Sequence, residues 1–341
     1  MGITASEAKE AYELAGNFTK AGELLGVHAT TVSRIIQREE AKQAADFEAP
    51  ELPSSVAPVG EIIERQLKIY ERKKAAAEAR SLIDIKVKID GPYGIAHGGD
   101  PHLDDNGANW PRLLRDLDII KNTEGLFGAN VGDVTNNWIG RLAAIYANQN
   151  TTESEAWKLA EWFIEELCPL YLVGGNHDVW AGGKDPLKWM MGQQPGVQGD
   201  HGVRLRLKAP SGRDCLINAR HDFPGRSQYT PAFGPAKAAF KGQAYHILTC
   251  GHIHSSGYQI VKNPMSGTIS HAIRISAYKQ FDDFADKLGF DDHHVFECPV
   301  TVIDPHARDE RDFVKVFFSP EAGADYLSFA RAKYNQGKTI H

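Results

Sequence analysis

Apolar and polar residues alternate with two different periods along the chain, and the change of period divides it into parts. Over residues 1–43 apolar positions recur at helical spacing in three segments, with breaks near Gly16 and between Gly26 and His28. In the third segment Val32, Ile35 and Ile36 share one face. The pattern predicts a small all-helical domain over residues 1–43.

Residues 44–60 break this periodicity, because they carry three prolines, small residues and few aliphatic side chains. Such a composition predicts a semi-extended linker. Residues 61–81 then fit a single helix of mixed charge with a thin apolar stripe that includes Ile63, Leu67 and Tyr70. We expect this helix to brace the next domain or to pair with a second copy of the chain.

From residue 82 onward short apolar runs alternate with amphipathic segments. Ten runs predict strands, at residues 82–89, 93–99, 125–132, 170–175, 203–208, 214–220, 245–251, 272–278, 300–304 and 313–318. Helices are predicted over residues 109–122 and 152–167. The alternation predicts an α/β domain, with sheets covered by helices, over residues 82–318 and a C-terminal tail over residues 319–341.

Composition narrows the class of protein. The 341 residues carry 38 Lys and Arg against 44 Asp and Glu, a formal net charge of −6, which argues against coating nucleic acid or membrane through bulk positive charge. The four cysteines are far apart and form no disulfide framework, and we find neither a secretory signal nor an apolar run of membrane-spanning length. We therefore expect a cytoplasmic protein that does not bind membranes.

Polar clusters follow five of the predicted strands directly. They contain Asp100 and His102, Asp133, Asn176 with His177 and Asp178, His221, and His252 with His254. Ligands bind at the carboxyl edge of open α/β sheets, so we expect these side chains to converge there. Oxygen and imidazole donors without thiolate favour Mn²⁺ first, with Fe, Zn or Ni as alternatives. Seven ligands are too many for one ion and suit two.

Two other histidines compete with His221 as a ligand. His201 and His246 each open a predicted strand rather than follow one. We therefore expect both to lie at the opposite end of the sheet from the metal ligands.

The ordered set D-x-H, G-D, G-N-H-D, H and G-H-x-H resembles the calcineurin-like metallophosphoesterase superfamily over about residues 82–305. The resemblance implies a two-sheet αββα sandwich. It also implies that Asp100, His102 and His254 bind one metal, that Asn176, His221 and His252 bind the other, and that Asp133 bridges both. In such a site a metal-bridging hydroxide is the nucleophile, and His177 protonates the leaving oxygen as a general acid or stabilises the charge on the phosphoryl group. Asp178 would orient His177 or cap the following turn.

The sequence departs from the serine/threonine protein phosphatases of that superfamily, which carry G-D-x-x-D-R-G and G-N-H-E. Residues 132–137 are Gly-Asp-Val-Thr-Asn-Asn here, and the second motif ends in Asp178. The substrate-gripping arginine and the glutamate are both missing, which disfavours phosphoprotein phosphatase activity. Asn136, Asn137 and Arg226 remain as candidates for binding the substrate phosphate.

Within residues 1–43, Gly22, Gly26 and Val32 fit the spacing of a helix-turn-helix. The segment resembles the Fis-type helix-turn-helix of bacterial DNA-binding proteins. The resemblance implies that a helix from Ala29 enters the major groove, with four DNA-contacting residues: Thr30, Thr31, Arg34 and Arg38. Residues 1–45 hold five basic against six acidic residues, so the alternative is a helical hairpin for protein contacts or dimerisation.

Three functions follow as hypotheses. The first is a two-metal phosphoesterase that hydrolyses phosphodiester bonds in nucleic acid, a nuclease of bacterial or phage origin placed on DNA by its N-terminal module. The second is a small-molecule phosphatase or a cyclic-nucleotide phosphodiesterase. The third is a DNA-binding or phage assembly protein with a vestigial metal site, which the complete ligand set disfavours.

Overall fold

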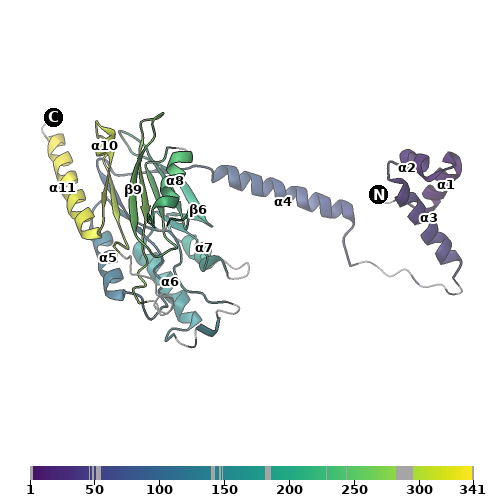
Figure 1. The fold of residues 1–341 in the computed structure, drawn as a ribbon, viewed down its shortest axis with the longest axis horizontal. Coiled ribbons are helices and arrows are strands. Elements are labelled where there is room, and N and C mark those ends of the chain that lie inside the picture. The colour runs from purple at the N-terminus through teal and green to yellow at the C-terminus, as the bar shows by residue number, and fades with distance from the viewer. Residues whose placement is uncertain are drawn as a thin grey trace. The chain divides into compact units, whose positions relative to one another are not determined.

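The chain forms two compact units, Met1–Ala77 and Glu78–His341. The structure, a computed structural model, describes residues 3–45, 47, 50, 55–139, 143–145, 147, 149–180, 186–227, 229–242, 244–281 and 295–339 (Figure 1). Part of the predicted linker, residues 46, 48–49 and 51–54, lies outside these residues. In the part of the chain that the structure describes, no helix combines the length and the apolarity needed to cross a membrane.

The first unit contains three short helices, α1 (Ala5–Ala15), α2 (Phe18–Leu25) and α3 (Ala29–Gln43), followed by most of α4 (Val59–Ala79). Helices α1 and α2 end at Gly16 and Gly26, whose left-handed backbone favours glycine. The buried side chains of α1–α3 form a small core: Ala8, Ala11, Ala21, Val32 and Ile36. No residue of α4 is buried.

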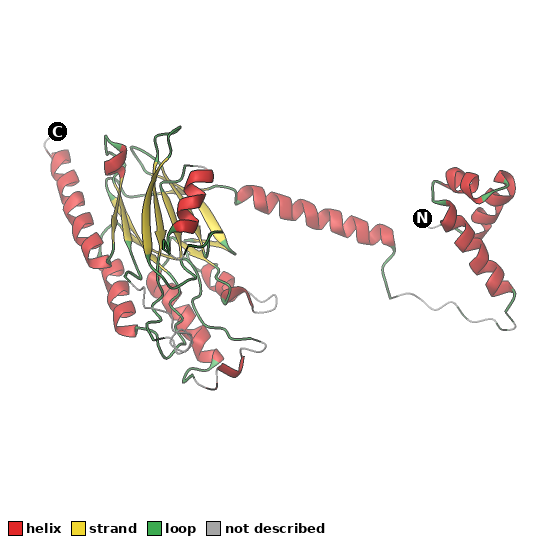
Figure 2. Ribbon diagram, viewed as in Figure 1, coloured by secondary structure: helices red, strands yellow, loops and turns green. Residues whose placement is uncertain are grey.

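The second unit contains two six-stranded sheets packed face to face, with helices outside both (Figure 2). One sheet has the order β1-β6-β7-β8-β10-β9 and the other β12-β11-β2-β3-β4-β5. The first comprises β1 (Ile83–Lys86), β6 (Gly202–Lys208), β7 (Cys215–Arg220), β8 (Ile247–Cys250), β9 (Gly257–Lys262) and β10 (Ile269–Arg274). The second comprises β2 (Tyr93–Gly98), β3 (Leu126–Asn130), β4 (Tyr171–Val173), β5 (Val197–Gly199), β11 (Val300–Ile303) and β12 (Val314–Phe317).

Alternate residues of the strands fill the space between the sheets. Ile95, Val131 and Val173 from one sheet meet Leu205 and Ile217 from the other. The core is therefore continuous across the two sheets, and it fixes their carboxyl edges relative to one another.

The outer faces are covered by helices. Residues of α5 (Trp110–Asn122), α6 (Glu153–Leu167), α7 (Pro186–Met191) and α11 (Pro320–Thr339) pack on the β2-containing sheet, and residues of α8 (Phe233–Lys241) pack on the other. The short α10 (Glu310–Phe313) precedes β12, and a 3₁₀ turn spans Asp178–Trp180. The predicted αββα class is confirmed.

The residues predicted as a C-terminal tail form α11, which belongs to this sandwich. Its Leu327 and Ala324 are buried in the outer core. Gly323 faces Val300 of β11 so closely that an added Cβ would lie 2.4 Å from the valine Cβ. A glycine at this point lets the helix lie directly on the sheet.

Candidate metal centre

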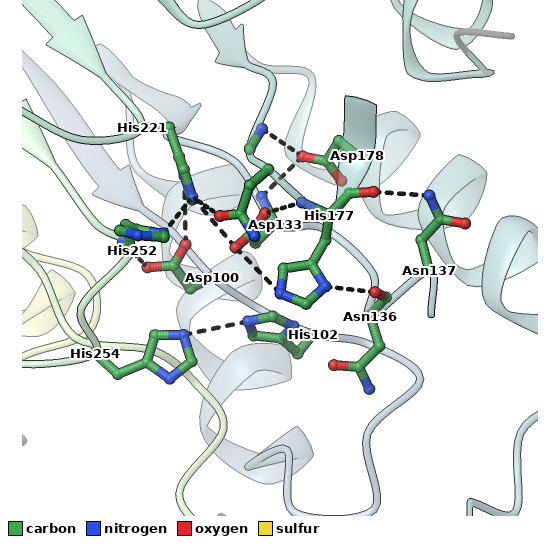
Figure 3. A network of polar contacts seen from close by, with 12 residues as sticks. Asp100, His102, Asp133, Asn136, Asn137, His177, Asp178, His221, His252 and His254 are labelled. Carbon is green, nitrogen blue, oxygen red and sulfur yellow. Dashed lines mark hydrogen bonds and ion pairs between the residues drawn. The ribbon is translucent and has the colours of Figure 1, made fainter. Parts of the chain in front are cut away.

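The predicted metal ligands come together where the carboxyl ends of β2, β3, β4, β7 and β8 meet (Figure 3). Asp100, Asp133 and Asn176 follow strands of one sheet, whereas His221 and His252 follow strands of the other. The site therefore lies on the seam between the two sheets.

The backbone at the site adopts a conformation that residues with side chains rarely take. Asp100, His102, Asp133, His252 and His254 all have positive φ, between 43° and 71°. A left-handed conformation costs on the order of 1 kcal/mol for each such residue. Five such residues in one site indicate that the surrounding structure fixes these loops in a strained backbone conformation, as is common at functional sites.

One group of donors surrounds His221. Its Nε2 lies 2.9 Å from Oδ1 of Asn176, 3.1 Å from Nδ1 of His252 and 3.2 Å from Oδ2 of Asp133. Its Nδ1–H donates to the carbonyl oxygen of Val131 at 2.9 Å. That hydrogen bond leaves the Nε2 lone pair for a metal, as in other histidine–metal sites. The donor atoms of Asp133, His221 and His252 lie within 4.8 Å of one another, close enough to hold one cation.

A second group contains His102 and His254, whose Nε2 atoms face each other at 3.3 Å. Asp100 lies between the groups, where its Oδ2 accepts the backbone N–H of His252 at 2.6 Å. Among the described residues, Oδ1 of Asp100 and Nδ1 of His102 are buried and have no hydrogen-bond partner. Buried polar atoms in folded proteins usually have a partner, and a ligand bound at this site could supply one.

Burial and neighbouring charges shift the pKa values of the carboxylates at the site. Burial raises the pKa of Asp100 to about 8, although His221 opposes the rise. Burial also acts to raise the pKa of Asp133, but the hydrogen bond and charge of His221 outweigh it and hold that pKa below its usual range. The charge of Asp133 acts on His102 as well as on His221. The charge of Asp133 therefore acts on both histidine groups.

The side chains fit two divalent cations. The site offers oxygen and imidazole donors, an unpartnered carboxylate oxygen, and two imidazole nitrogens that point at each other. Divalent cations would neutralise the carboxylates and separate the facing nitrogens. The group containing His102 and His254, with Asp100, suits one ion, and the group around His221 suits the other.

His177 lies beside the ligands with one ring nitrogen fixed. Its Nδ1 lies 2.5 Å from the carbonyl oxygen of Asn136, and its Nε2 lies 3.9 Å from Oδ2 of Asp133. The Trp138 ring packs edge-on against it, with ring centroids 5.1 Å apart. The imidazole is therefore oriented with Nε2 toward the ligand cluster.

Asp178 is buried and its carboxylate accepts three backbone N–H groups. Oδ2 accepts from Asp133 and Gly175, both at 2.8 Å, and Oδ1 accepts from Val134 at 3.1 Å. These bonds join the loop that carries Asp133 to the loop that carries Asn176. The sequence suggested that Asp178 orients His177 or caps the following turn, whereas these contacts go to the preceding Gly175 and to the Asp133 loop, and we infer that Asp178 positions ligands.

Asn136 and Asn137, predicted to contact substrate, use their amides within the protein. Asn136 is fully buried and its Nδ2 donates to Asp105 at 3.0 Å, while Nδ2 of Asn137 donates to the carbonyl of His177 at 2.7 Å. Both residues therefore support the His177 loop. Arg226 is 57% exposed and pairs with Oδ2 of Asp222 at 3.0 Å.

Sequence reasoning missed a buried arginine behind the site. Arg274 is fully buried, and its guanidinium donates to the carbonyls of Gly251 and Pro231 and to Oδ1 of Asp222 at 2.9 Å. Gly251 precedes His252 and Asp222 follows His221, so one side chain ties two ligand loops together. The signal was available in the sequence, as a charged residue inside an apolar strand.

One expectation about the rival histidines was wrong. His246 lies at the far end of the sheet, where its Nδ1 accepts the backbone N–H of Leu216 at 2.9 Å. His201, however, lies at the metal-bearing edge, because β6 runs antiparallel to β7. Its carbonyl accepts the N–H of His221 at 3.4 Å.

The four predicted DNA-contacting residues belong to the other unit. Thr30, Thr31, Arg34 and Arg38 are all exposed on α3. The hydroxyl of Thr30 lies 2.9 Å from Nδ1 of His28, which also caps the helix.

Comparison with known proteins gives distant structural likenesses. No protein-family model and no curated protein sequence matches the chain. It is similar to Vps29 from Cryptosporidium parvum (12% identity, 67% of this chain, 100% of that chain, TM-score 0.37). It is also similar to the calcineurin-like phosphoesterase YfkN from Bacillus subtilis (10% identity, 73% of this chain, 98% of that chain, TM-score 0.40). A third similar structure is Vps29 from Chaetomium thermophilum (12% identity, 66% of this chain, 91% of that chain, TM-score 0.31). Identities this low do not show a function, so the functional proposal rests on the geometry of the site.

Proposed function

We propose that this chain is a two-metal phosphoesterase that hydrolyses phosphodiester bonds, with nucleic acid as its substrate. The observation that carries the proposal is the convergence of seven oxygen and imidazole ligands on one seam, with the Nε2 of His177 directed at Asp133 beside them. Ligands for two cations and an adjacent oriented imidazole are what in-line displacement at phosphorus requires.

The cations supply Lewis acidity and lower the pKa of water when they are bound, and Mn²⁺ suits this donor set. The chain's own residues do the rest. Asp133 lies between the two histidine groups and would hold both ions, while Asp178 and Arg274 fix the loops that carry the ligands. The seven ligands together would fix the positions of both ions, and thereby the position of a phosphate ester bound to those ions.

His177 is placed to exchange a proton through Nε2. Its Nδ1–H donates to the carbonyl of Asn136 whether the ring is neutral or charged, so the mobile proton belongs to Nε2. A protonated Nε2 would give its proton to the leaving oxygen as the ester bond breaks.

A nucleic-acid substrate is favoured by the first unit, whose α3 would enter the major groove. Its exposed Thr30, Thr31 and Arg34 would face bases, and Arg38 a phosphate. A tether between the units raises the effective concentration of the site near bound DNA. The competing proposal is a small-molecule phosphatase or cyclic-nucleotide phosphodiesterase, in which the first unit mediates protein contacts or dimerisation.

An activity panel with Mn²⁺ tests the proposal. We expect hydrolysis of single- or double-stranded DNA and of an aryl phosphodiester, with slower turnover of phosphomonoesters and cyclic nucleotides. Turnover of small esters without any cleavage of nucleic acid would favour the competing proposal.

Metal analysis tests the site independently of substrate. We expect two Mn²⁺ ions per chain, and a melting temperature that falls with a chelator and recovers with Mn²⁺. Free Mn²⁺ at 100 times the Kd of a site stabilises the folded state by about 2.7 kcal/mol for that site, which thermal unfolding detects easily. Absence of bound metal after purification in Mn²⁺ would remove the basis of the proposal.

The DNA role of α3 needs its own measurement. Replacing Arg34 and Arg38 by Ala should weaken binding of duplex DNA by the full chain while leaving hydrolysis of an aryl phosphodiester unchanged. Fluorescence anisotropy at several salt concentrations measures this, because each lost phosphate contact lowers the salt dependence. Unchanged duplex binding would assign the first unit to protein contacts.

A further inference from the structure

A pocket of about 240 Å³ lies next to the metal centre. It is lined by residues from the start of β1, from β6 and β7, and from the turn joining β5 to β6; its charged and ionisable members are Arg80, Asp200, His201 and Arg220. None of these residues belongs to the predicted ligand set.

The pocket shares its walls with two ligand loops. Arg220 directly precedes His221, and the carbonyl of His201 accepts the N–H of His221 at 3.4 Å. On the other side, the N–H of Gly174 donates to the carbonyl of Gly199 at 2.8 Å, and a Cβ added to Gly174 would lie 2.7 Å from the carbonyl oxygen of Asp200. The pocket therefore borders the loops that carry His221 and Asn176.

The charges in this pocket favour an anion. The lining holds two guanidinium groups, those of Arg80 and Arg220, against a single carboxylate, that of Asp200. One N–H of Arg80 donates to the carbonyl of Gln198 at 2.9 Å. Arg220 makes one long bond to the carbonyl of Asp222 at 3.4 Å and lies over the ring of Phe223. Each guanidinium has five N–H donors, so most remain for a ligand.

We propose that this pocket binds a phosphate group of a polynucleotide whose scissile phosphodiester lies at the metal centre. The proposal rests on the proposed function and narrows its substrate class. Arginine is suited to phosphate because its fork of donors matches two phosphate oxygens. A polynucleotide carries further phosphates beside the scissile one, whereas an aryl phosphodiester or a cyclic nucleotide carries only the one that is cleaved.

The main test compares two substrates in one variant. Arg80→Ala changes a residue that precedes β1 and lies outside the ligand loops; Arg220→Gln is the second variant. For either change, we expect kcat/KM on a single-stranded oligonucleotide to fall about tenfold or more relative to kcat/KM on an aryl phosphodiester, mainly through KM. The matched control is Arg204→Ala, an exposed arginine of β6 outside the pocket, which should leave the ratio unchanged. An equal loss on both substrates would overturn the proposal.

A binding measurement separates this proposal from the proposed function. Anisotropy of a labelled single-stranded oligonucleotide is measured with a chelator present, in a full chain that also carries Arg34→Ala and Arg38→Ala. We expect Arg80→Ala to weaken binding and to reduce the salt slope by about 0.7, the value for one single-strand phosphate contact. Unchanged oligonucleotide binding would refute the pocket, as would an effect of Arg80→Ala confined to inorganic phosphate. Arginine-dependent binding in a chain that cleaves no phosphodiester would sustain the pocket and refute the proposed function.

Discussion

The Nδ1 atom of His177 lies 2.5 Å from the carbonyl oxygen of Asn136, and this contact decides which ring nitrogen faces Asp133. The carbonyl can only accept, so it fixes a proton on Nδ1 and leaves Nε2 for chemistry. Asn136 is in turn held by Asp104 and Asp105, which accept its backbone and side-chain N–H groups.

Replacing His177 by Gln should lower turnover by about 10²- to 10⁴-fold, the usual contribution of a general acid. Metal content should stay at the wild-type value, because His177 is not among the ligands. Steady-state kinetics and metal analysis of the same preparation check both statements. The comparison variant is His252→Gln, which should lose metal as well as activity. Loss of metal from His177→Gln would make His177 a ligand instead.

Replacing Asp222 by Asn should weaken the binding of one of the two metal ions by about 10- to 100-fold, the effect of changing an outer partner of metal ligands. Asp222 pairs with the buried Arg274, which holds the loop of His252, and Asp222 itself follows His221. Titration of the metal-free chain with Mn²⁺ measures the change.

The matched control for Asp222 is Asp84→Asn, which removes a partly exposed carboxylate paired with Lys208 at 2.6 Å on the same sheet. Metal affinity should not change in this control. If Asp222→Asn lowers the melting temperature but binds both ions with wild-type affinity, the Arg274–Asp222 pair stabilises the fold without positioning ligands.

Two buried histidines away from the metal centre predict a pH dependence of stability. Burial lowers the pKa of His246 to about 4, while Glu310 opposes the shift and Arg213 adds to it. Burial likewise lowers the pKa of His271 to about 4. In the unfolded chain a histidine titrates near 6.5, so between about pH 6.5 and 4 the unfolded state binds more protons, and stability falls as the pH falls.

His246→Gln should reduce this loss of stability by up to about 3 kcal/mol between pH 6.5 and 4. Glutamine retains an acceptor for the N–H of Leu216, so the hydrogen bond of the native ring can be replaced. Urea unfolding at several pH values, in wild type and variant under the same conditions, measures the difference. Parallel pH profiles for the two proteins would show that the pKa of His246 is the same in the folded and unfolded states.

Gly22→Ala should destabilise helices α1–α3, although alanine usually favours a helix over glycine by about 1 kcal/mol. A Cβ at this position would lie 2.5 Å from the backbone oxygen of Val27, too close to fit without moving the turn. Amide exchange of residues 5–43 in the full chain should become faster. Gly60→Ala in α4 has open space around the added Cβ and serves as the control. Unchanged protection in Gly22→Ala would show that the turn can shift at little cost.

Local pattern was enough to predict most of the sandwich, since runs such as Tyr93–Gly98 are buried along their whole length. It missed β5, which has three residues, and β9, an edge strand that is mostly half-buried or exposed. It missed α8 because Ala232 provides no side-chain cap at the helix start. These elements owe their conformation to neighbours in space, which no local window contains.

The placement of His201 shows where local reasoning about a site stops. Its sequence context says that it opens a strand, but only the pairing of β6 with β7 decides at which edge that strand begins. The same holds for Arg80, which reaches the pocket from a segment 118 residues before its hydrogen-bond partner Gln198. Short motifs could therefore predict the metal ligands. The residues that surround the ligands, such as His201 and Arg80, depend on how distant strands pair, which no motif contains.

The ligands stand on five loops drawn from both sheets, between residues 100 and 254. Cations bound there would join the two sheets in addition to the apolar packing between them and the hydrogen bonds of His221 with Val131 and of His252 with Asp100. Any motion that slides one sheet over the other has to break coordination first. The rate at which the chain releases its metal should therefore report on how often the two sheets separate. Slow release would show that they rarely do.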